Sequence, residues 1–294
     1  MSAGTIALPR GRAAAPSRLG RIGRGLRRYP IGYLGVAIVV LVVALALLAD
    51  LVTPYDPVWQ IDERLTPPNA DYVLGLDEFG RDVYSRIIYG ARVSLYVGIV
   101  SVICIAVPLG TVLGVVAGYF RGWVDAWLSR FVDVMFAFPS IILAIAIVGI
   151  LGPSLTNAMI AIGLVYSPTF ARVARGSTLA VVSLDYIMAS RTIGARDRRI
   201  IWRHILPNIA APLIIQTTLA LSTAILAEAA LSFLGLGTQP PMPSWGTMLG
   251  TGRRYMELAP WVAIYPGVAI MITVLGFNLA GDGLRDALDP RLRE

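Results

Sequence analysis

The uncharged stretch VSLYVGIVSVICIAVPLGTVLGVVAG, residues 93–118, decides the fold class of this chain. The hydrocarbon core of a bilayer needs about 20 apolar residues from each crossing helix, and this run is longer than that. The rest of the 294-residue chain has the same character, since 56% of its residues are hydrophobic and only 15% are charged. Soluble domains carry about 25% charged residues. The composition therefore predicts an all-α polytopic membrane protein.

Further uncharged runs on both sides of this stretch predict the other crossings. They cover residues 134–171, 209–227 and 258–281, and another apolar run follows residue 30. The run 134–171 is too long for one helix, and the Gly-Pro-Ser sequence at 152–154 supplies the turn that divides it. The sequence thus predicts about six transmembrane helices, the first over residues 31–52. The tripeptide at 44–46 imitates a signal-peptide cleavage box, but it lies in the middle of its run, which favours an uncleaved helix.

The charges between these runs predict the orientation. Residues 1–30 contain many arginines and no acid, residues 53–92 are rich in acids, and residues 172–208 are again rich in arginine. Positive residues stay on the cytoplasmic side of a membrane protein. We therefore expect a basic flexible cytoplasmic tail (1–30) and a single transmembrane domain (31–294). Both termini and the loop at about 172–208 are expected in the cytoplasm, and the loop at about 53–92 outside.

Missing residue types exclude several functions. All 25 basic residues are arginine, so the chain has no lysine for an ATP-binding P-loop or for Schiff-base catalysis. One cysteine, Cys104, and one histidine, His204, exclude a CxxC redox pair, a disulfide and a His/Cys metal cage. We expect this chain not to be an enzyme, to bind no cofactor or metal, and to have no nucleic-acid partner.

A basic segment, ASRTIGARDRRIIWRHILPN at residues 189–208, lies between two apolar runs. We expect Asp185 to cap one short helix, Gly194 to interrupt the pattern, and Asp197 to begin a second helix that Pro207 ends. Glycine at 194 suits a positive φ angle or a close backbone approach. The second helix would carry an apolar stripe and a basic flank. Such an element suits docking into a groove of another protein, and the alternative is a basic loop lying on anionic lipid.

These residues resemble the cytoplasmic EAA loop of bacterial ABC importer permeases, roughly EAAxxxGA followed after a spacer by a hydrophobic residue, Leu and Pro. The matching stretches are MASRTIGA at 188–195 and ILPN at 205–208. Glycine, spacer and proline match the family. Met188 stands where the family has Glu and Ser190 where it has the second Ala, so an ion pair made through that Glu is not implied here.

Two further regions carry the same resemblance. The stretch LGLDEFGRDVYSRIIYGARVSLYVG, residues 74–98, is similar to the LGTDxxGRDxxSRxxxGxRxSL signature of dipeptide, oligopeptide and nickel permeases, with Leu76 in place of Thr. The stretches EAALSFLGLGTQPPMPSWG at 228–246 and GDGLRDALDPRLR at 281–293 resemble the fifth-span exit and the C-terminus of that family. The chain thus resembles the C-type permease subunit of a peptide-class importer, which implies the type I ABC importer permease fold.

That resemblance implies a role for the basic segment: a coupling helix seated in a groove of a separate ATPase. The implied coupling residues are Ala189, Arg191, Gly194, Ala195, Arg198, Arg199, Trp202, Arg203, His204 and Pro207. The implied partners are two ABC ATPase subunits that hold ATP and Mg, a homologous B-type permease and an extracytoplasmic solute-binding protein, in the lipid bilayer of the bacterial inner membrane. Solute would then move by alternating access. Di- or oligopeptides are the commonest cargo of the family, with nickel chelates, glutathione and other small solutes as minorities.

Two other sites leave alternatives open. Glu228 is the one acid well inside an apolar span, and intramembrane acids are functional candidates. It is either a bundle-facing carboxyl bonded to a neighbouring helix, or a pore or gate residue. In the alternative function, proton-coupled secondary transport, it would carry the proton. Asp77, Arg81 and Asp82, just before the second span, are either a turn with a local ion pair or a contact for the binding protein.

Overall fold

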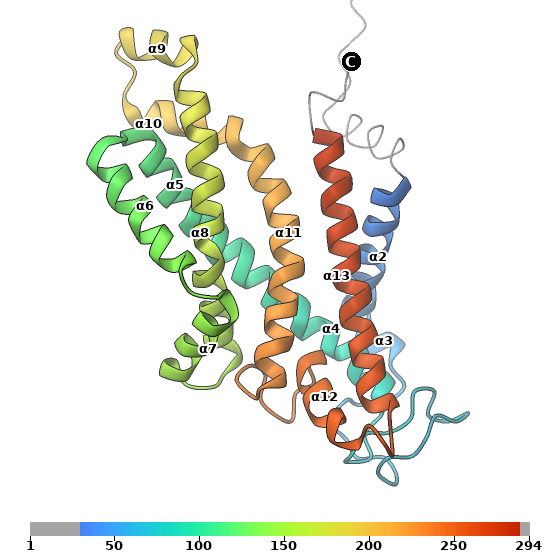
Figure 1. The fold of residues 1–294 in the computed structure, drawn as a ribbon. Coiled ribbons are helices and arrows are strands. Elements are labelled where there is room, and N and C mark those ends of the chain that lie inside the picture. The colour runs from blue at the N-terminus through green and yellow to red at the C-terminus, as the bar shows by residue number, and fades with distance from the viewer. Residues whose placement is uncertain (1–29, 289–294) are drawn as a thin grey trace, which may run out of the picture.

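The computed structural model describes residues 30–288, and within that range the regular structure is helical except for one isolated antiparallel bridge between Leu76 and Asp82 (Figure 1). Residues 1–29 of the expected basic tail and residues 289–293 of the C-terminal motif lie outside the described range. The all-helical architecture predicted from the composition is confirmed for the described part of the chain.

Long helices account for most of the chain, and several of them are joined end to end. In chain order they are α2 (Pro30–Leu47), α3 (Ala49–Val52), α4 (Val83–Ile99), the π-helix η1 (Val100–Ala106), α5 (Val107–Phe120), α6 (Gly122–Phe136), α7 (Ser140–Leu151), α8 (Leu155–Val182), α9 (Asp185–Thr192), α10 (Asp197–Ile200), the π-helix η2 (Ile201–Ile205), α11 (Leu206–Phe233), α12 (Trp245–Gly252), the 3₁₀-helix η3 (Arg253–Tyr255) and α13 (Trp261–Leu288). The segments α4–η1–α5 and α10–η2–α11 each form one continuous helix.

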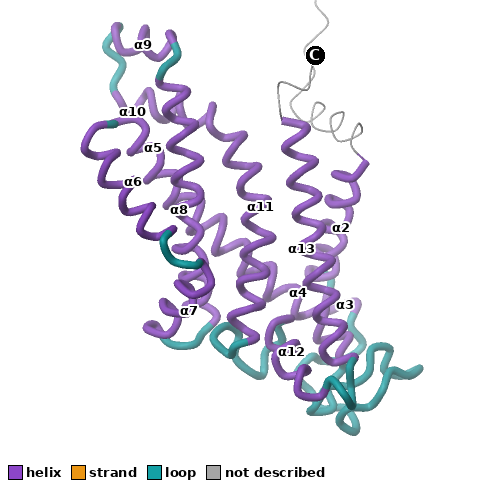
Figure 2. The backbone as a smooth tube through the Cα atoms, in the orientation of Figure 1, coloured by secondary structure: helices purple, strands orange, loops and turns teal. Residues whose placement is uncertain are grey.

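The two ends of the bundle differ in character. One end, here called the α9 end, holds α9 and α10, the start of α2 and the end of α13 (Figure 1). The opposite end, here called the α12 end, holds α12 and the long loop between α3 and α4, drawn in teal in Figure 2. The arginine-rich loop and both ends of the described chain therefore share one side, as the charge pattern requires. Which side faces the cytoplasm stays a prediction from charge.

Within residues 30–288, three helices are long and apolar enough to cross a membrane: Val83–Phe120, Asp197–Phe233 and Trp261–Leu288. The pair α6 and α7, bent by 91° at its break, would make a fourth. Two further helices fall short, since the apolar stretch of α2 is Ile31–Leu47 and α8 is long enough but less apolar. The predicted number of six crossings corresponds to these six units and stays a prediction.

Close glycine contacts hold α5 against α8. A Cβ atom at Gly110 would lie 2.3 Å from the carbonyl oxygen of Ser167, and one at Gly114 would lie 2.3 Å from that of Ala171. Any larger residue would force the two backbones apart, because small residues are what allows helices to approach this closely. The two helices therefore form one tightly packed unit inside this chain.

Two loop boundaries differ from the prediction, because a helix begins earlier in one case and ends later in the other than the charge pattern suggested. The loop expected over 53–92 ends at Asp82, whose Oδ2 accepts a hydrogen bond of 2.7 Å from the backbone N–H of Ser85 and so caps α4. At the α9 end, α8 continues to Val182, well into the loop expected over 172–208. Charged residues thus lie on the ends of helices rather than in separate loops.

The prediction that Pro207 ends the second loop helix is wrong. Proline lacks an N–H, and its ring crowds the carbonyl four residues earlier, which disfavours a helix interior. Here Pro207 falls in the first turn of α11, directly after the π-helical turn Ile201–Ile205. The wider hydrogen-bond spacing of a π-helix accommodates the proline, so the helix runs on from Asp197 to Phe233.

Candidate functional site

The loop at the α9 end consists of two short helices joined at Gly194. The backbone N–H of Gly194 donates to the carbonyl of Arg191 at 2.9 Å, and that of Ala195 donates to the carbonyl of Ser190 at 3.0 Å. Gly194 has a φ of +80°, and a Cβ added there would meet nothing within 4 Å. The positive φ is therefore the reason for glycine, and close approach of another part of this chain is not.

The start of this loop differs from the prediction in one respect. Asp185 is the first residue of α9 rather than its cap, and Leu184 occupies the cap position without a side-chain hydrogen bond. Asp185 still lies where the partial positive charge of the helix N-terminus favours an acid. Arg191 lies in the last turn of the same helix, where a cation is favoured.

Buried isoleucines fix the two short helices on the bundle. Ile187 of α9, Ile200 of α10 and Ile205 of η2 are all fully buried. The amide nitrogen of Asn208 also donates to the hydroxyl of Tyr186 at 3.2 Å, which joins the start of α11 to α9. Of the apolar stripe expected on the second helix, Ile205 is buried, Ile201 and Leu206 are half-buried against the core, and Trp202 stays exposed. Part of the stripe therefore packs inward, because a fold buries aliphatic side chains against its own helices.

The outward face of the loop is basic and aromatic. A shallow hollow of about 730 Å³ is lined by Arg196, Arg198, Arg199, Trp202 and Arg203. Trp202 is 67% exposed, unusual for the largest apolar side chain. Of the other expected coupling residues, Ala189, Arg191, Gly194 and Pro207 are exposed, and Ala195 and His204 are half-buried. The His204 ring lies 5.9 Å from the ring of Tyr186.

Exposed apolar side chains extend this face onto α9. Met188, at the position where the EAA pattern has Glu, is 63% exposed, and Ile193 beside the glycine is 84% exposed. Large apolar groups next to guanidinium groups are the composition of a protein-binding surface rather than of a solvated loop. The loop can thus present a mixed apolar and basic surface to a partner.

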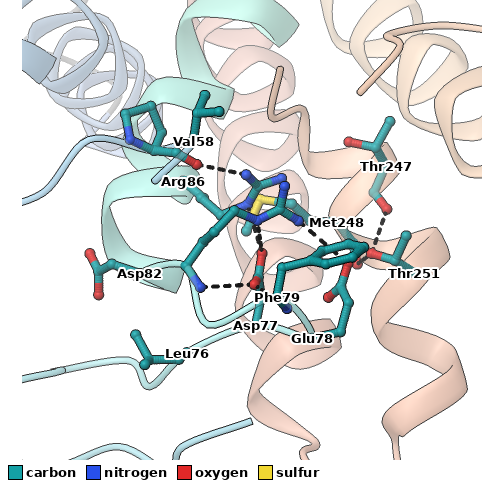
Figure 3. Close-up of polar contacts among 12 residues, drawn as sticks. Val58, Leu76, Asp77, Glu78, Phe79, Asp82, Arg86, Thr247, Met248 and Thr251 are labelled. Carbon is teal, nitrogen blue, oxygen red and sulfur yellow. Dashed lines mark hydrogen bonds and ion pairs between the residues drawn. The ribbon is translucent and has the colours of Figure 1, made fainter. Parts of the chain in front are cut away.

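At the α12 end, a buried cluster of charges holds the loop before α4. Oδ1 of Asp77 accepts hydrogen bonds from the backbone N–H groups of Phe79 at 2.8 Å and Arg81 at 3.0 Å, and Oδ2 accepts from Nε of Arg81 at 2.7 Å. Nε of Arg86 lies 3.2 Å from the same Oδ2, an ion pair whose N–H does not point at the oxygen. Figure 3 draws these contacts, with Asp77 pointing toward Arg86.

Two further donors of this cluster also have partners inside the chain. Nη1 of Arg86 donates to the carbonyl of Pro57 at 2.7 Å, and Nη2 of Arg81 lies 3.5 Å from Oε1 of Glu78. Asp77 and Asp82 are at most 2% exposed and Arg81 is 9% exposed. In this structure the three residues considered for a binding-protein contact face inward. The large hydrophobic residues exposed on the same loop are Trp59, Val73 and Phe79.

Glu228 of α11 also lies at the α12 end and is fully buried. Its Oε2 accepts a hydrogen bond from the hydroxyl of Ser94 on α4 at 3.0 Å, and its Oε1 accepts one from Ser232 at 2.7 Å. The Ser232 oxygen in turn accepts from the backbone N–H of Thr238 at 3.0 Å. The carboxyl is thus a bonded junction between two helices and the turn that follows α11.

Comparison with known proteins places the chain in a family. The family profile described as "Binding-protein-dependent transport system inner membrane component" matches residues 110–294, which is more than half of the chain. The chain belongs to this family. A second profile, "N-terminal TM domain of oligopeptide transport permease C", matches residues 17–68 of the permease.

Curated relatives match most of the permease. The dipeptide transport system permease protein DppC of Alkalihalophilus pseudofirmus is 46% identical over 269 residues, 91% of this chain and 88% of the relative. The di/tripeptide transport system permease protein DppC of Pseudomonas aeruginosa is 48% identical over 266 residues, 88% of each chain. The glutathione transport system permease protein GsiD of Pectobacterium atrosepticum is 46% identical over 257 residues, 87% of this chain and 85% of the relative.

A solved structure shows the same fold. An inward-facing form of the MetNI methionine ABC transporter superposes with a TM-score of 0.55, at 23% identity, over 69% of this chain and 96% of that chain. A second crystal form of the same transporter gives the same TM-score and identity, over 69% of this chain and 97% of that chain. The ABC importer permease fold and the inner-membrane location implied by the sequence motifs are thus confirmed. The family works in ABC importers, whose other components are ATPases and solute-binding proteins.

The described part of the permease contains no candidate metal site. Among residues 30–288, no three His, Cys, Asp or Glu side chains are grouped so that they could hold an ion. Cys104 is an exposed free thiol on the π-helix between α4 and α5.

Sequence reasoning missed three residues of these sites. Arg86 belongs to the quoted GRDxxSR pattern, so the motif itself was a signal for a second arginine in the cluster. Ser94 lies in an uncharged run without any feature that marks it as a partner of Glu228. Tyr119, whose hydroxyl donates to Oδ1 of Asp197 on α10 at 2.5 Å, directly follows the same run and likewise carries no local signal.

Proposed function

We propose that this permease is the C-type subunit of an ATP-driven importer of di- or oligopeptides, and that it forms the pore together with a homologous B-type permease. The observation that supports peptides as the transported substrate is the 46–48% identity to two dipeptide or di/tripeptide permeases over about nine-tenths of the chain. Relatives that carry glutathione match almost as well, so short peptides and peptide-like solutes are the proposed class.

The loop at the α9 end is the proposed contact with the ATPase. Its face combines exposed Trp202, Ile193 and Met188 with arginines, and its inner side is anchored by buried isoleucines. An element with one anchored side and one exposed side transmits a force applied to the exposed side. Two ATPase subunits that close on ATP would move this loop, and differential binding of nucleotide to the two states would switch the pore between outward and inward openings.

The loop at the α12 end is the proposed landing site of the solute-binding protein. Asp77, Arg81 and Asp82 support that contact indirectly, because their buried bonds fix the shape of the loop. Trp59, Val73 and Phe79 supply its exposed apolar surface. In this proposal the buried charged residues hold the loop in shape, and the exposed apolar residues contact the binding protein.

The chemistry of ATP is proposed to lie wholly on the partner subunits, since this chain contains no lysine for a P-loop. The coupling residues would touch the ATPase surface, not the nucleotide. This chain would thus form part of the transport pathway and transmit the movement of the ATPase, without catalysing a reaction itself.

Reconstitution of the complete complex into vesicles tests this function. Vesicles with the binding protein outside and ATP inside should accumulate a labelled dipeptide, and a non-hydrolysable ATP analogue should abolish uptake. The purified permease alone should hydrolyse no ATP above background. Dipeptide uptake that ignores ATP and follows an imposed proton gradient would instead support the secondary-transporter alternative.

A further inference from the structure

Tyr119 lies in the last turn of α5, directly beneath the loop at the α9 end, and is 5% exposed. Its hydroxyl donates a hydrogen bond of 2.5 Å to Oδ1 of Asp197. The guanidinium carbon of Arg191 lies 5.0 Å from the centre of its ring, within the range of a cation–π contact. Tyr119 thus makes two different interactions with the loop.

The two interactions of Tyr119 involve residues on both sides of Gly194 in the sequence. Arg191 lies in the last turn of α9 and Asp197 is the first residue of α10, with Gly194 between them. One side chain of the bundle therefore holds the ends of both short helices at the point where the backbone turns. The angle between α9 and α10 depends on this side chain as well as on the glycine.

The part of α5 that carries Tyr119 is packed tightly against a neighbouring helix and is therefore rigid. The α5 backbone packs directly on α8, since a Cβ atom at Gly118 would lie 2.9 Å from the carbonyl oxygen of Arg175. Arg175 donates in turn from Nη2 to Oδ2 of Asp125 on α6 at 2.6 Å. A displacement of the short helices would therefore reach α5, α8 and α6 through a set of direct contacts.

We propose that Tyr119 is a positioning residue that fixes the geometry of the α9–α10 loop and transmits its movement to α5. This inference rests on the proposed function, since it identifies where the movement imposed by the ATPase enters the transmembrane bundle. The hydroxyl is the group that distinguishes this role from packing, because phenylalanine would fill the same space and keep the ring under Arg191.

The test uses the complete reconstituted complex with Tyr119→Phe. We expect assembly and melting temperature close to those of the unchanged complex, and a fall of about fivefold in peptide transported per ATP hydrolysed, within the range known for coupling residues. Asp197→Asn, which weakens the acceptor, should lower the same ratio. Combining the two changes should lower the ratio no further than Tyr119→Phe alone, because both act on the same hydrogen bond.

Tyr89→Phe is the matched control. The hydroxyl of Tyr89 donates to Oδ1 of Asp50 at 2.6 Å, the same type of bond at the α12 end. This change should leave the coupling ratio unaltered. An equal fall in the control, an unchanged ratio in Tyr119→Phe, or loss of assembly in Tyr119→Phe would each overturn the positioning role.

A second measurement separates this inference from the proposed function. In the permease without its partners, amide hydrogen exchange at residues 193–197 should speed up in Tyr119→Phe and stay unchanged in Tyr89→Phe. Unchanged exchange at these residues would overturn the inference even if the complex imports peptides. Faster exchange together with ATP-independent uptake would contradict the proposed function and leave the loop geometry as described.

Discussion

The hydroxyl of Ser94 on α4 donates a hydrogen bond of 3.0 Å to Oε2 of Glu228 on α11, across 134 residues of sequence. Because Glu228 is fully buried and also bonded to Ser232, its carboxyl joins two helices and the turn after α11. A buried polar group is retained in an apolar bundle when its hydrogen bonds are satisfied. This geometry favours the bundle-facing interpretation of Glu228 over a role as proton carrier.

Glu228→Gln should therefore retain most ATP-dependent uptake, since the amide keeps the shape and both serine hydroxyls can turn to donate or accept. Glu228→Leu should lower the stability of the permease by about 1–3 kcal/mol, because it leaves buried hydroxyl groups without their partner. Melting in detergent and uptake by reconstituted complex measure the two effects. A Glu228→Gln variant that loses all uptake, in a complex driven by protons, would restore the proton-carrier interpretation.

The charge cluster predicts different effects on the melting temperature for changes at Asp77 and at Phe79. Asp77→Ala would leave Arg81 and Arg86 buried without their shared carboxylate, and breaking one side of a buried ion pair costs about 3 kcal/mol or more. We expect this variant to melt at a clearly lower temperature and to reach the membrane in reduced amounts.

Phe79→Ala is the contrasting change in the same loop. The Phe79 side chain is 53% exposed and the centre of its ring lies 4.6 Å from the guanidinium carbon of Arg81, so its removal should lower the melting temperature much less than Asp77→Ala does. It should weaken binding of the solute-binding protein to the complex, measured as the concentration needed to stimulate ATP hydrolysis. Full stimulation by the usual concentration would remove Phe79 from the proposed landing site.

The sequence predicted those features that depend on local chemistry. Uncharged runs predicted helices, and the Gly-Pro-Ser turn at 152–154 falls between α7 and α8, with Ser154 capping α8 through the backbone N–H of Asn157. Gly194 was expected to need either a positive φ or a close backbone approach, and the positive φ is confirmed.

Features that depend on distant partners were not predictable in the same way. Nothing local shows that Asp77 is buried between two arginines, because a charged turn near a membrane surface is usually solvated. Nothing local joins Tyr119 to Asp197, which lies 78 residues further along the chain. The continuation of the helix through Pro207 needed the π-helical turn before it, and no residue pattern specifies such a turn.

The orientation in the membrane is testable with single cysteines in a Cys104→Ser background. Ala70→Cys reports on the loop between α3 and α4, and the neighbouring Asn69 is left unchanged because its Oδ1 accepts hydrogen bonds from the backbone N–H groups of Asp71 and Tyr72. Both Ala70 and Arg198 are exposed. In intact cells, Ala70→Cys should react with a membrane-impermeant maleimide, and Arg198→Cys should react only after the cells are opened. The reverse pattern would overturn the orientation predicted from charge.

Gly194 offers the sharpest test of the loop at the α9 end. Its φ of +80° belongs to the left-handed region, where a side chain costs about 1–2 kcal/mol and where a β-branched residue is an outlier. Since a Cβ atom there would touch nothing within 4 Å, the strain would come from the backbone and not from a clash. Gly194→Val should therefore change the angle between α9 and α10 while the transmembrane helices insert normally.

The expected result in the complex is weaker co-purification of the ATPase, or ATP hydrolysis without matching peptide uptake. Gly194→Asn is the matched control, because asparagine tolerates the left-handed region and adds a side chain of similar size. It should keep assembly and uptake near normal. If instead both variants lose ATPase binding equally, the added side chain matters and not the φ angle, which would mean that the partner approaches this glycine closely. If both variants assemble and transport normally, the loop is a basic segment on the membrane surface, and its arginines serve anionic lipid rather than an ATPase.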